Sequence, residues 1–241
     1  MKPLAGRVAV VTGATRGIGA STAIALAAEG AHIIAMGRKT KPLEEVDDLI
    51  TGAGGSATLV PLNLTDGAAI DRLGASIHER WGKLDILVGN AGQLGVISPL
   101  PHIKAKVWDE TMAVNVTANW RLIRSLDPLL RQSDAGRCVF LTSLAARMNR
   151  ANWGVYGVSK AALEALVFTY ANEMKNTRVR VNLFSPGPVR TGMRAQAIPG
   201  EDPSTLPHPD DIAPQIVPLC RPDFTQHGAL VECDREALAK A

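Results

Sequence analysis

Short apolar stretches alternate with helical patterns along most of the chain, and this alternation constrains the fold more than any other feature. The expected strands cover residues 7–12, 31–36, 56–64, 84–90, 137–143, 178–187 and 229–233. The expected helices cover residues 20–30, 41–51, 66–81, 104–130, 156–176 and 210–220. Several strands are apolar on both faces, which is typical of a parallel sheet covered by helices on two sides. The pattern predicts a single α/β domain over residues 1–241, a doubly wound parallel sheet with helices on both faces.

Charge and composition argue against several classes of protein. The net charge is only +3, from 26 Lys and Arg against 23 Asp and Glu. No basic patch is interleaved with aromatic residues, so we expect no nucleic-acid partner. No run approaches the roughly 18 apolar residues of a membrane span, so we expect no membrane partner. The cysteines Cys138, Cys220 and Cys233 are odd in number and far apart, which favours free thiols in a reducing cytoplasm over a disulfide framework or a metal site.

A glycine turn joins the first expected strand to the first expected helix. Gly13, Gly17 and Gly19 follow a GxxxGxG spacing, and no Lys-Ser or Lys-Thr pair follows them as in a P-loop. Such a turn lets the backbone approach a pyrophosphate closely and directs a helix N-terminus at its charge. Tight helix–strand packing is the alternative explanation, but the position after the first strand favours a nucleotide site.

The end of the second expected strand predicts which dinucleotide binds. An acid at this place would accept hydrogen bonds from the adenosine ribose and repel a 2′-phosphate. The chain instead has Arg38 beside Lys39, with Arg16 in the glycine turn. Arginines pair with phosphates through charge-assisted hydrogen bonds. A solvated group of cations is the alternative, but the pattern favours NADP(H) over NAD(H).

The segment from Ser143 to Lys160 carries the most reactive set of side chains. Tyr156 and Lys160 are four residues apart, so on a helix they share one face. A neighbouring ammonium is expected to lower the pKa of the Tyr156 phenol and make it a proton donor and acceptor. Taken alone, such a pair is more often an ordinary Tyr and Lys on a surface helix.

Together these segments resemble the short-chain dehydrogenase/reductase family of Rossmann-type oxidoreductases. The resemblance rests on Thr12–Gly19, Asn90-Ala91-Gly92, the tetrad Asn115, Ser143, Tyr156 and Lys160, and Pro186-Gly187 with Thr191. It covers about residues 5–220 and is strongest to short bacterial members such as the 3-oxoacyl-carrier-protein reductases. It implies a nucleotide-binding half over about residues 5–100 and a catalytic, substrate-binding half over about residues 101–241.

The resemblance implies a role for each catalytic residue. Tyr156 would be the general acid in reduction and the general base in oxidation, with Lys160 lowering its pKa and holding the nicotinamide ribose. Ser143 would hydrogen-bond the substrate oxygen, and Asn115 would anchor a water that relays protons. The cofactor contacts would be Gly13, Thr15, Arg16, Gly17, Ile18, Gly19, Arg38, Asn63, Leu64, Asn90, Ala91, Gly92, Tyr156, Lys160, Pro186, Gly187, Val189 and Thr191.

The chain departs from the family pattern in three places. Asn63 stands where an Asp is usual, residues 191–210 are short and Pro-rich, and the C-terminal stretch lacks the usual Asp-Gly-Gly. The last two departures affect the substrate pocket, whose wall could include Leu94, Met148, Trp153 and Met193, although such residues are more often simply packed.

The implied activity is hydride transfer between NADP(H) and a carbonyl or alcohol substrate, which is a small molecule of apolar character. A nucleotide sensor without turnover is one alternative, and the complete tetrad argues against it. A sugar-nucleotide epimerase is another, and the chain leaves little room for its extra substrate domain. The resemblance also implies a homo-oligomer, a tetramer or a dimer, paired through the helices that carry Asn115 and Tyr156.

Overall fold

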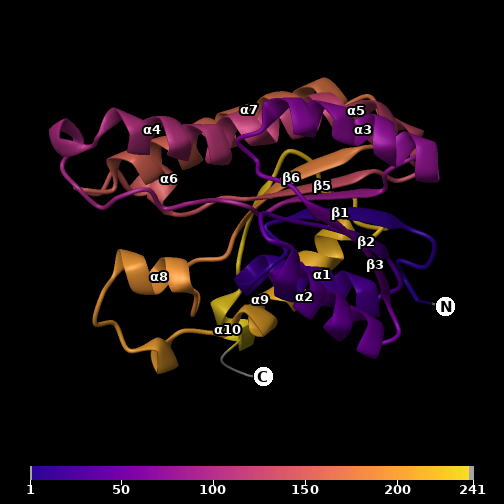
Figure 1. Cartoon of the computed structure of the whole chain (residues 1–241), viewed down its shortest axis with the longest axis horizontal. Helices are drawn as coiled ribbons and strands as arrows, with labels where there is room; N and C mark the ends of the chain where they lie inside the picture. The colour runs from indigo at the N-terminus through magenta and orange to yellow at the C-terminus, as the bar shows by residue number, and fades with distance from the viewer. Residues whose placement is uncertain (1, 239–241) are drawn as a thin grey trace.

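The computed structural model describes residues 2–238, and its centre is a seven-stranded sheet in the order β3-β2-β1-β4-β5-β6-β7 (Figure 1). The strands are β1 (Val8–Thr12), β2 (His32–Gly37), β3 (Ser56–Pro61), β4 (Ile86–Gly89), β5 (Arg137–Leu141), β6 (Arg180–Ser185) and β7 (Leu230–Glu232). All neighbouring strands pair in parallel. The strand order reverses between β1 and β4, which opens a crevice at the carboxyl ends of these strands. The predicted doubly wound, Rossmann-type α/β fold is confirmed.

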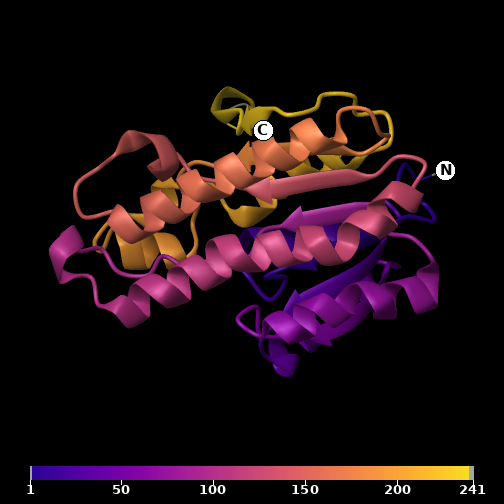
Figure 2. The ribbon, with the colours of Figure 1, turned by 90° about the horizontal axis from the view of Figure 1, so that it is seen from above.

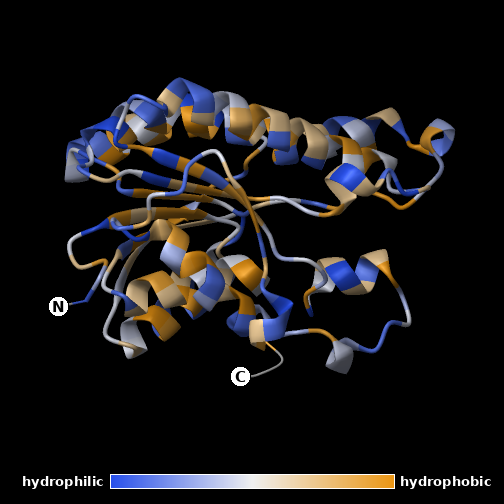
Figure 3. Ribbon diagram, turned by 180° about the vertical axis from the view of Figure 1, so that it is seen from behind, coloured by the Kyte–Doolittle hydropathy of each residue, from blue (hydrophilic) through white to orange (hydrophobic). Residues whose placement is uncertain are grey.

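Helices cover both faces of the sheet (Figure 1). They are α1 (Gly17–Ala28), α2 (Thr40–Gly52), α3 (Gly67–Trp81), α4 (Ala105–Met112), α5 (Ala118–Gln132), α6 (Ala145–Met148), α7 (Gly154–Met174), α8 (Gly192–Ala197), α9 (Pro209–Cys220) and α10 (Arg235–Leu238). Hydrophobic and hydrophilic residues alternate in patches along these helices, as in amphipathic helices (Figure 3). In the part of the chain that the structure describes, no helix is long and apolar enough to cross a membrane.

Each face of the sheet has its own hydrophobic core. Val8 and Val10 of β1 pack with α3, α5 and α7, whereas Ala9 and Val11 pack with α1, α2 and α9. All five residues of β1 are buried, because successive side chains of a strand point to opposite faces and both faces are covered. This explains the continuous apolar strands in the sequence.

The predicted helix over residues 104–130 is interrupted in the middle. The chain is helical from Ala105 to Gln132, but a π-helical turn at Ala113–Thr117 separates α4 from α5. A π turn takes one residue more than an α-helical turn and changes the direction of the side chains around it. Asn115 lies in this turn.

The Pro-rich segment over residues 191–210 contains a helix that the sequence did not predict. Thr191 caps α8 by accepting a hydrogen bond from the Arg194 backbone nitrogen at 3.2 Å. The Arg194 guanidinium then pairs with both oxygens of Glu201, at 2.6 Å each. A 3₁₀ turn, Pro203–Thr205, follows. Local capping and one bidentate ion pair therefore give this short segment a defined shape.

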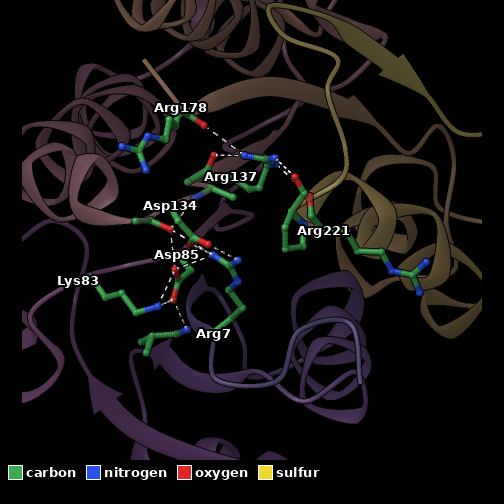
Figure 4. Close-up of polar contacts among 12 residues, drawn as sticks. Arg7, Lys83, Asp85, Asp134, Arg137, Arg178 and Arg221 are labelled. Atoms are coloured by element: carbon green, nitrogen blue, oxygen red, sulfur yellow. Dashed lines mark hydrogen bonds and ion pairs between the residues drawn. The ribbon is translucent and has the colours of Figure 1, made fainter. Parts of the chain in front are cut away.

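A buried carboxylate joins three elements at the amino edge of the sheet (Figure 4). Asp85, directly before β4, is completely buried. Its carboxylate accepts hydrogen bonds from the Arg7 guanidinium at 3.0 Å and the Ser133 hydroxyl at 2.6 Å. It also accepts one from the Val8 backbone nitrogen at 2.9 Å, and the Lys83 ammonium lies 3.0 Å away. Asp85 thus ties the starts of β1 and β4 to the end of α5.

Candidate functional site

A cavity of about 1000 Å³ lies at the carboxyl edge of the sheet, where the strand order reverses. Many of the residues predicted for the site line it, namely Gly13, Thr15, Arg16, Gly17, Ile18, Arg38, Asn63, Leu64, Asn90, Ala91, Gly92, Tyr156, Lys160, Pro186 and Thr191. Within residues 2–238, the remaining predicted residues, Gly19, Asn115, Ser143, Gly187 and Val189, do not form part of its wall. The structure therefore brings most of the predicted set together around one space.

The cavity also has wall residues that the sequence reasoning missed. Gln93 lies beyond the Asn90–Gly92 motif, and Asp109 and Glu110 lie on α4. Arg190, Gln196 and His208 come from the segment around α8. Gln93 directly follows the Asn90–Gly92 motif and Arg190 directly precedes Thr191, so their positions in the sequence could have suggested them. No pattern in the sequence marks the others.

The glycine turn packs closely against the segment after β4. A Cβ atom added at Gly19 would lie 2.3 Å from both the Asn90 Nδ2 and the Gly13 carbonyl oxygen. Asn90 Nδ2 donates to the Thr12 carbonyl at 2.8 Å, and the Thr12 hydroxyl accepts from the Asn90 and Ala91 backbone nitrogens at 3.0 Å each. Gly19 is therefore required for packing.

The start of α1 is open to the cavity. Its N-cap residue, Arg16, makes no side-chain capping bond, and Gly17 and Ile18 of the first turn line the cavity. Gly17 has a φ of +57°, a conformation that favours glycine. Free backbone N–H groups at the N-terminus of a twelve-residue helix attract anions. These features fit a dinucleotide pyrophosphate.

Two arginines give the cavity wall beside β1 and β2 a positive charge. Arg16 precedes α1 and Arg38 follows β2, and both line the cavity. Within residues 2–238 neither makes an ion pair. Guanidinium groups without an ion-pair partner, before α1 and after β2, fit a 2′-phosphate, which pairs well with arginine.

Tyr156 and Lys160 lie on one face of α7, as their spacing predicts. The Lys160 Nζ is 5.9 Å from the centroid of the Tyr156 ring and donates to the Leu141 carbonyl at 2.8 Å. The pKa of Lys160 is lowered to about 8, because the effect of burial is larger than the opposing effect of the Glu164 carboxylate, which raises the pKa. Tyr156 is 8% and Lys160 4% exposed.

The expected direction of the Tyr156 pKa is wrong. Burial raises the pKa of the Tyr156 phenol, and the Ser143 hydroxyl lowers it by a smaller amount. Because water is excluded around the ring, the loss of solvation of a phenolate outweighs the favourable hydrogen bond. The phenol therefore stays protonated at neutral pH.

Asn115 holds two segments of the site together. Its Oδ1 accepts from the Gln93 backbone nitrogen at 2.8 Å, and its Nδ2 donates to the Gln93 carbonyl and the Ser159 hydroxyl at 2.9 Å each. Both Nδ2 hydrogens are thus used. The side chain fixes the segment after β4 against α7, on which Tyr156 stands.

Apolar side chains pack around Tyr156. Leu94 and Ala197 are buried against its ring, and the partly buried residues packed with them are Ile97, Ala145, Trp153, Met193 and Ile198. The Trp153 and Tyr156 rings meet edge to face, with centroids 6.1 Å apart. Of the four expected wall residues, Leu94, Trp153 and Met193 belong to this cluster, whereas Met148 is 57% exposed. One side of Tyr156 is therefore hydrophobic, whereas Ser143 and Lys160 lie on another.

The strand order, the glycine turn and the open helix N-terminus define a dinucleotide-binding α/β protein. The family model described as short chain dehydrogenase matches residues 7–202. The chain belongs to the short-chain dehydrogenase family of oxidoreductases.

Relatives and solved structures agree with this assignment. The chain is 40% identical over 211 residues to the Escherichia coli (strain K12) protein named "Uncharacterized oxidoreductase YciK", covering 86% of this chain and 83% of the relative. A putative short chain dehydrogenase from Pseudomonas syringae superposes with a TM-score of 0.93 at 42% identity, covering 96% of each chain.

Two other similar structures contain a nucleotide. A putative short chain dehydrogenase from Shigella flexneri 2a str. 301, complexed with NADP, has a TM-score of 0.92 at 37% identity, covering 96% of this chain and 98% of the other. One from Escherichia coli CFT073, complexed with NADPH, has a TM-score of 0.90 at 37% identity with the same coverage.

Proposed function

We propose that the protein is an NADP(H)-dependent oxidoreductase that transfers a hydride between the nicotinamide and a carbonyl or alcohol substrate. The observation that carries the proposal is that Tyr156 and Lys160 line the same cavity as the glycine turn. Arg16 and Arg38 line it too, and within residues 2–238 neither makes an ion pair. The NADP and NADPH complexes of the Shigella and Escherichia proteins support the choice of cofactor.

Different groups of the protein would bind the different parts of the cofactor. The N-terminus of α1 would hold the pyrophosphate, and Arg16 and Arg38 would pair with the 2′-phosphate. Lys160, fixed by the Leu141 carbonyl, would hold the nicotinamide ribose hydroxyls. When bound, NADPH supplies the hydride and NADP⁺ accepts it.

The proton is handled by the chain itself. In reduction the Tyr156 hydroxyl would donate its proton to the substrate oxygen, and in oxidation the phenolate would take one from the alcohol. The raised Tyr156 pKa keeps the acid form available at neutral pH. The Ser143 hydroxyl would donate a hydrogen bond to the same oxygen and stabilise its developing charge. Asn115 would act by position, since its amide fixes Gln93 and Ser159.

We propose an apolar carbonyl compound of small or medium size as the substrate. The cluster of Leu94, Trp153, Met193 and Ile198 packs around Tyr156. A pocket of this kind binds through buried apolar area, worth about 25 cal/mol per Å².

Cofactor titration and turnover on the same preparation test the proposal. Purified protein is titrated with NADPH and NADH by fluorescence, then assayed with ketones, diketones, quinones and 3-oxoacyl thioesters. Tight NADPH binding with turnover is the expected result. Binding without turnover on any compound would favour the sensor alternative, and absence of nucleotide binding would contradict both.

Replacing Arg38 with alanine is expected to weaken NADPH binding while leaving NADH binding unchanged. Only NADPH carries the 2′-phosphate, and loss of one charge-assisted pair costs about tenfold in Kd. Fluorescence titration of both nucleotides measures the ratio. Arg72→Ala, which removes an exposed arginine of α3, is the matched control. Equal weakening of NADPH and NADH would contradict the assignment of Arg38.

The activity is expected to fall as the pH rises through about 8, where Lys160 loses its proton. The ammonium is charged below this pKa and neutral above it, so its hold on the ribose hydroxyls weakens on the alkaline side. The Glu164 carboxylate raises the Lys160 pKa and also accepts from the Thr142 hydroxyl at 2.7 Å, with Arg147 3.7 Å away.

Glu164→Gln removes that negative charge and should move the alkaline decline of kcat/KM to lower pH by about one unit. Glu173→Gln, on the exposed face of the same helix, is the matched control and should leave the profile unchanged. An unchanged profile in Glu164→Gln would show that Lys160 does not cause the decline.

We also propose that the protein forms a homo-oligomer through α5 and α7. These helices run side by side on the outer surface (Figure 2). Trp120 on α5 and Val158 on α7 are each 43% exposed, as expected of residues that another subunit covers. Sedimentation of the purified protein distinguishes a monomer, a dimer and a tetramer.

A further inference from the structure

The C-terminal segment runs beside the loop that follows β6. The last residues of the two strands pair in parallel, Ser185 with Glu232, and the Cys233 backbone nitrogen donates to the Ser185 carbonyl at 2.9 Å. Chains that leave neighbouring parallel strands continue in the same direction. Arg235 of α10 is therefore placed alongside the loop over residues 186–188.

Arg235 binds this loop through two carbonyl groups. Its Nη2 donates to the Pro186 carbonyl oxygen at 2.5 Å and to the Pro188 carbonyl oxygen at 2.6 Å. A Cβ atom added at Gly187 would lie 2.5 Å from the same nitrogen. One guanidinium nitrogen thus lies against all three residues of the loop.

Within residues 2–238, the loop over residues 186–188 makes hydrogen bonds only to Arg235, whereas Val189 beyond it is buried in the core. The pairing between β6 and β7 ends at Ser185, and a proline has no N–H group to donate at Pro186 or Pro188. Gly187 has a φ of +67°, so its backbone is left-handed. The two carbonyls that converge there accept from one guanidinium, which is a strong donor because it is always charged.

Arg235 is itself anchored to the core. The Gln215 side chain of α9 accepts from the Asp234 backbone nitrogen at 2.7 Å and donates to the Asp234 carbonyl at 3.0 Å. Neighbouring residues of α9, including Ile212 and Ile216, are completely buried under the sheet. The contacts of Gln215 with Asp234 and of Arg235 with the loop therefore hold the loop in place relative to α9.

The loop leads directly into the cavity. Pro186 and Thr191 line it, and a Cβ atom added at Gly17 would lie 3.5 Å from the Thr191 Cγ2. We propose that Arg235 is a positioning residue, which fixes the loop over residues 186–188 so that the segment through Thr191 receives the nicotinamide end of the cofactor. This inference rests on the proposed function, which places the nicotinamide ribose at Lys160, in the cavity that Pro186 and Thr191 also line.

Two ligands separate a local effect on the nicotinamide end from a general loss of binding. NADPH has the nicotinamide, whereas adenosine 2′,5′-bisphosphate has the adenosine and 2′-phosphate but no nicotinamide. Arg235→Ala should weaken NADPH binding about tenfold, the effect of losing charge-assisted hydrogen bonds. Its affinity for adenosine 2′,5′-bisphosphate should match that of the unmodified protein, which also shows that the variant is folded.

Two further variants complete the experiment. Arg235→Lys should recover part of the NADPH affinity, since an ammonium can donate to at least one carbonyl. Arg72→Ala should bind both ligands like the unmodified protein. Equal affinities of Arg235→Ala and the unmodified protein for NADPH would overturn the inference, as would equal weakening of both ligands. Failure of the unmodified protein to bind NADPH would instead count against the proposed function.

Discussion

Replacing Tyr156 with phenylalanine is expected to reduce carbonyl reduction by about 10²- to 10⁴-fold, the usual value of a positioned general acid. The substitution removes one hydroxyl and keeps the ring, which packs with Leu94, Trp153 and Ala197. The apolar wall and the cofactor residues therefore remain in place. NADPH affinity should change by less than about threefold, because the lost group acts on the substrate oxygen.

The other tyrosine of the chain is the matched control. Tyr170 lies further along α7 and donates to the Asp127 carboxylate at 2.9 Å. Tyr170→Phe also deletes a phenol hydroxyl from this helix, and it should retain full turnover with a slightly lower stability. Steady-state kinetics on both variants, with NADPH titrations beside them, give the comparison. Turnover of Tyr156→Phe within tenfold of the unmodified protein would rule out the proposed acid.

Replacing Asp85 with alanine is expected to lower the free energy of unfolding by about 3 kcal/mol. The carboxylate is completely buried and accepts from Arg7, Ser133 and Val8. Its removal leaves the Val8 N–H and the Ser133 hydroxyl without their acceptor. For a chain of this length the change corresponds to a fall in Tm of about 10 °C.

The second carboxylate on Arg7 is the control for this variant. Asp134 pairs with the same guanidinium, but its side chain is 67% exposed. Asp134→Ala should therefore cost less than about 1 kcal/mol, as surface ion pairs do. Urea unfolding measures both variants, and both should bind NADPH normally below the transition because the cavity lies at the opposite edge of the sheet. Equal losses from the two variants would show that burial of Asp85 does not set its contribution.

Much of the fold could be predicted because its signals are local and repeated. Apolar strands buried on both faces imply a parallel sheet, and the structure has one. The helix α8 was missed because six residues, GMRAQA, are too short to show a helical period. Its shape depends on the Thr191 cap and the Arg194–Glu201 pair. The π turn was missed because its five residues, AVNVT, are too few for a one-residue shift in the apolar pattern to be recognised.

The site was predictable where short motifs mark it, at a strand end or along one face of a helix. Asn90, Tyr156 and Lys160 reach the same cavity, as their motifs imply. The Tyr156 pKa could not be predicted, because spacing gives the nearness of an ammonium but not the exclusion of water. Arg235 could not be identified either, since only the three-dimensional pairing of β6 with β7 brings it to the loop after β6. The likeness to 3-oxoacyl-carrier-protein reductases stays a prediction.

The π turn at Ala113–Thr117 holds one residue more than an α-helical turn, and the direction of the Asn115 side chain depends on that extra residue. If this turn changed to α-helical hydrogen bonding with no residue removed, α4 would rotate against α5 by about 100°. Buried residues such as Leu122 and Leu126 fix α5 in the core, so α4 and Asn115 would turn. Gln93 would lose both bonds to the Asn115 amide. A substitution in this turn changes one side chain, whereas the extra residue of the turn sets the rotation of α4 relative to α5.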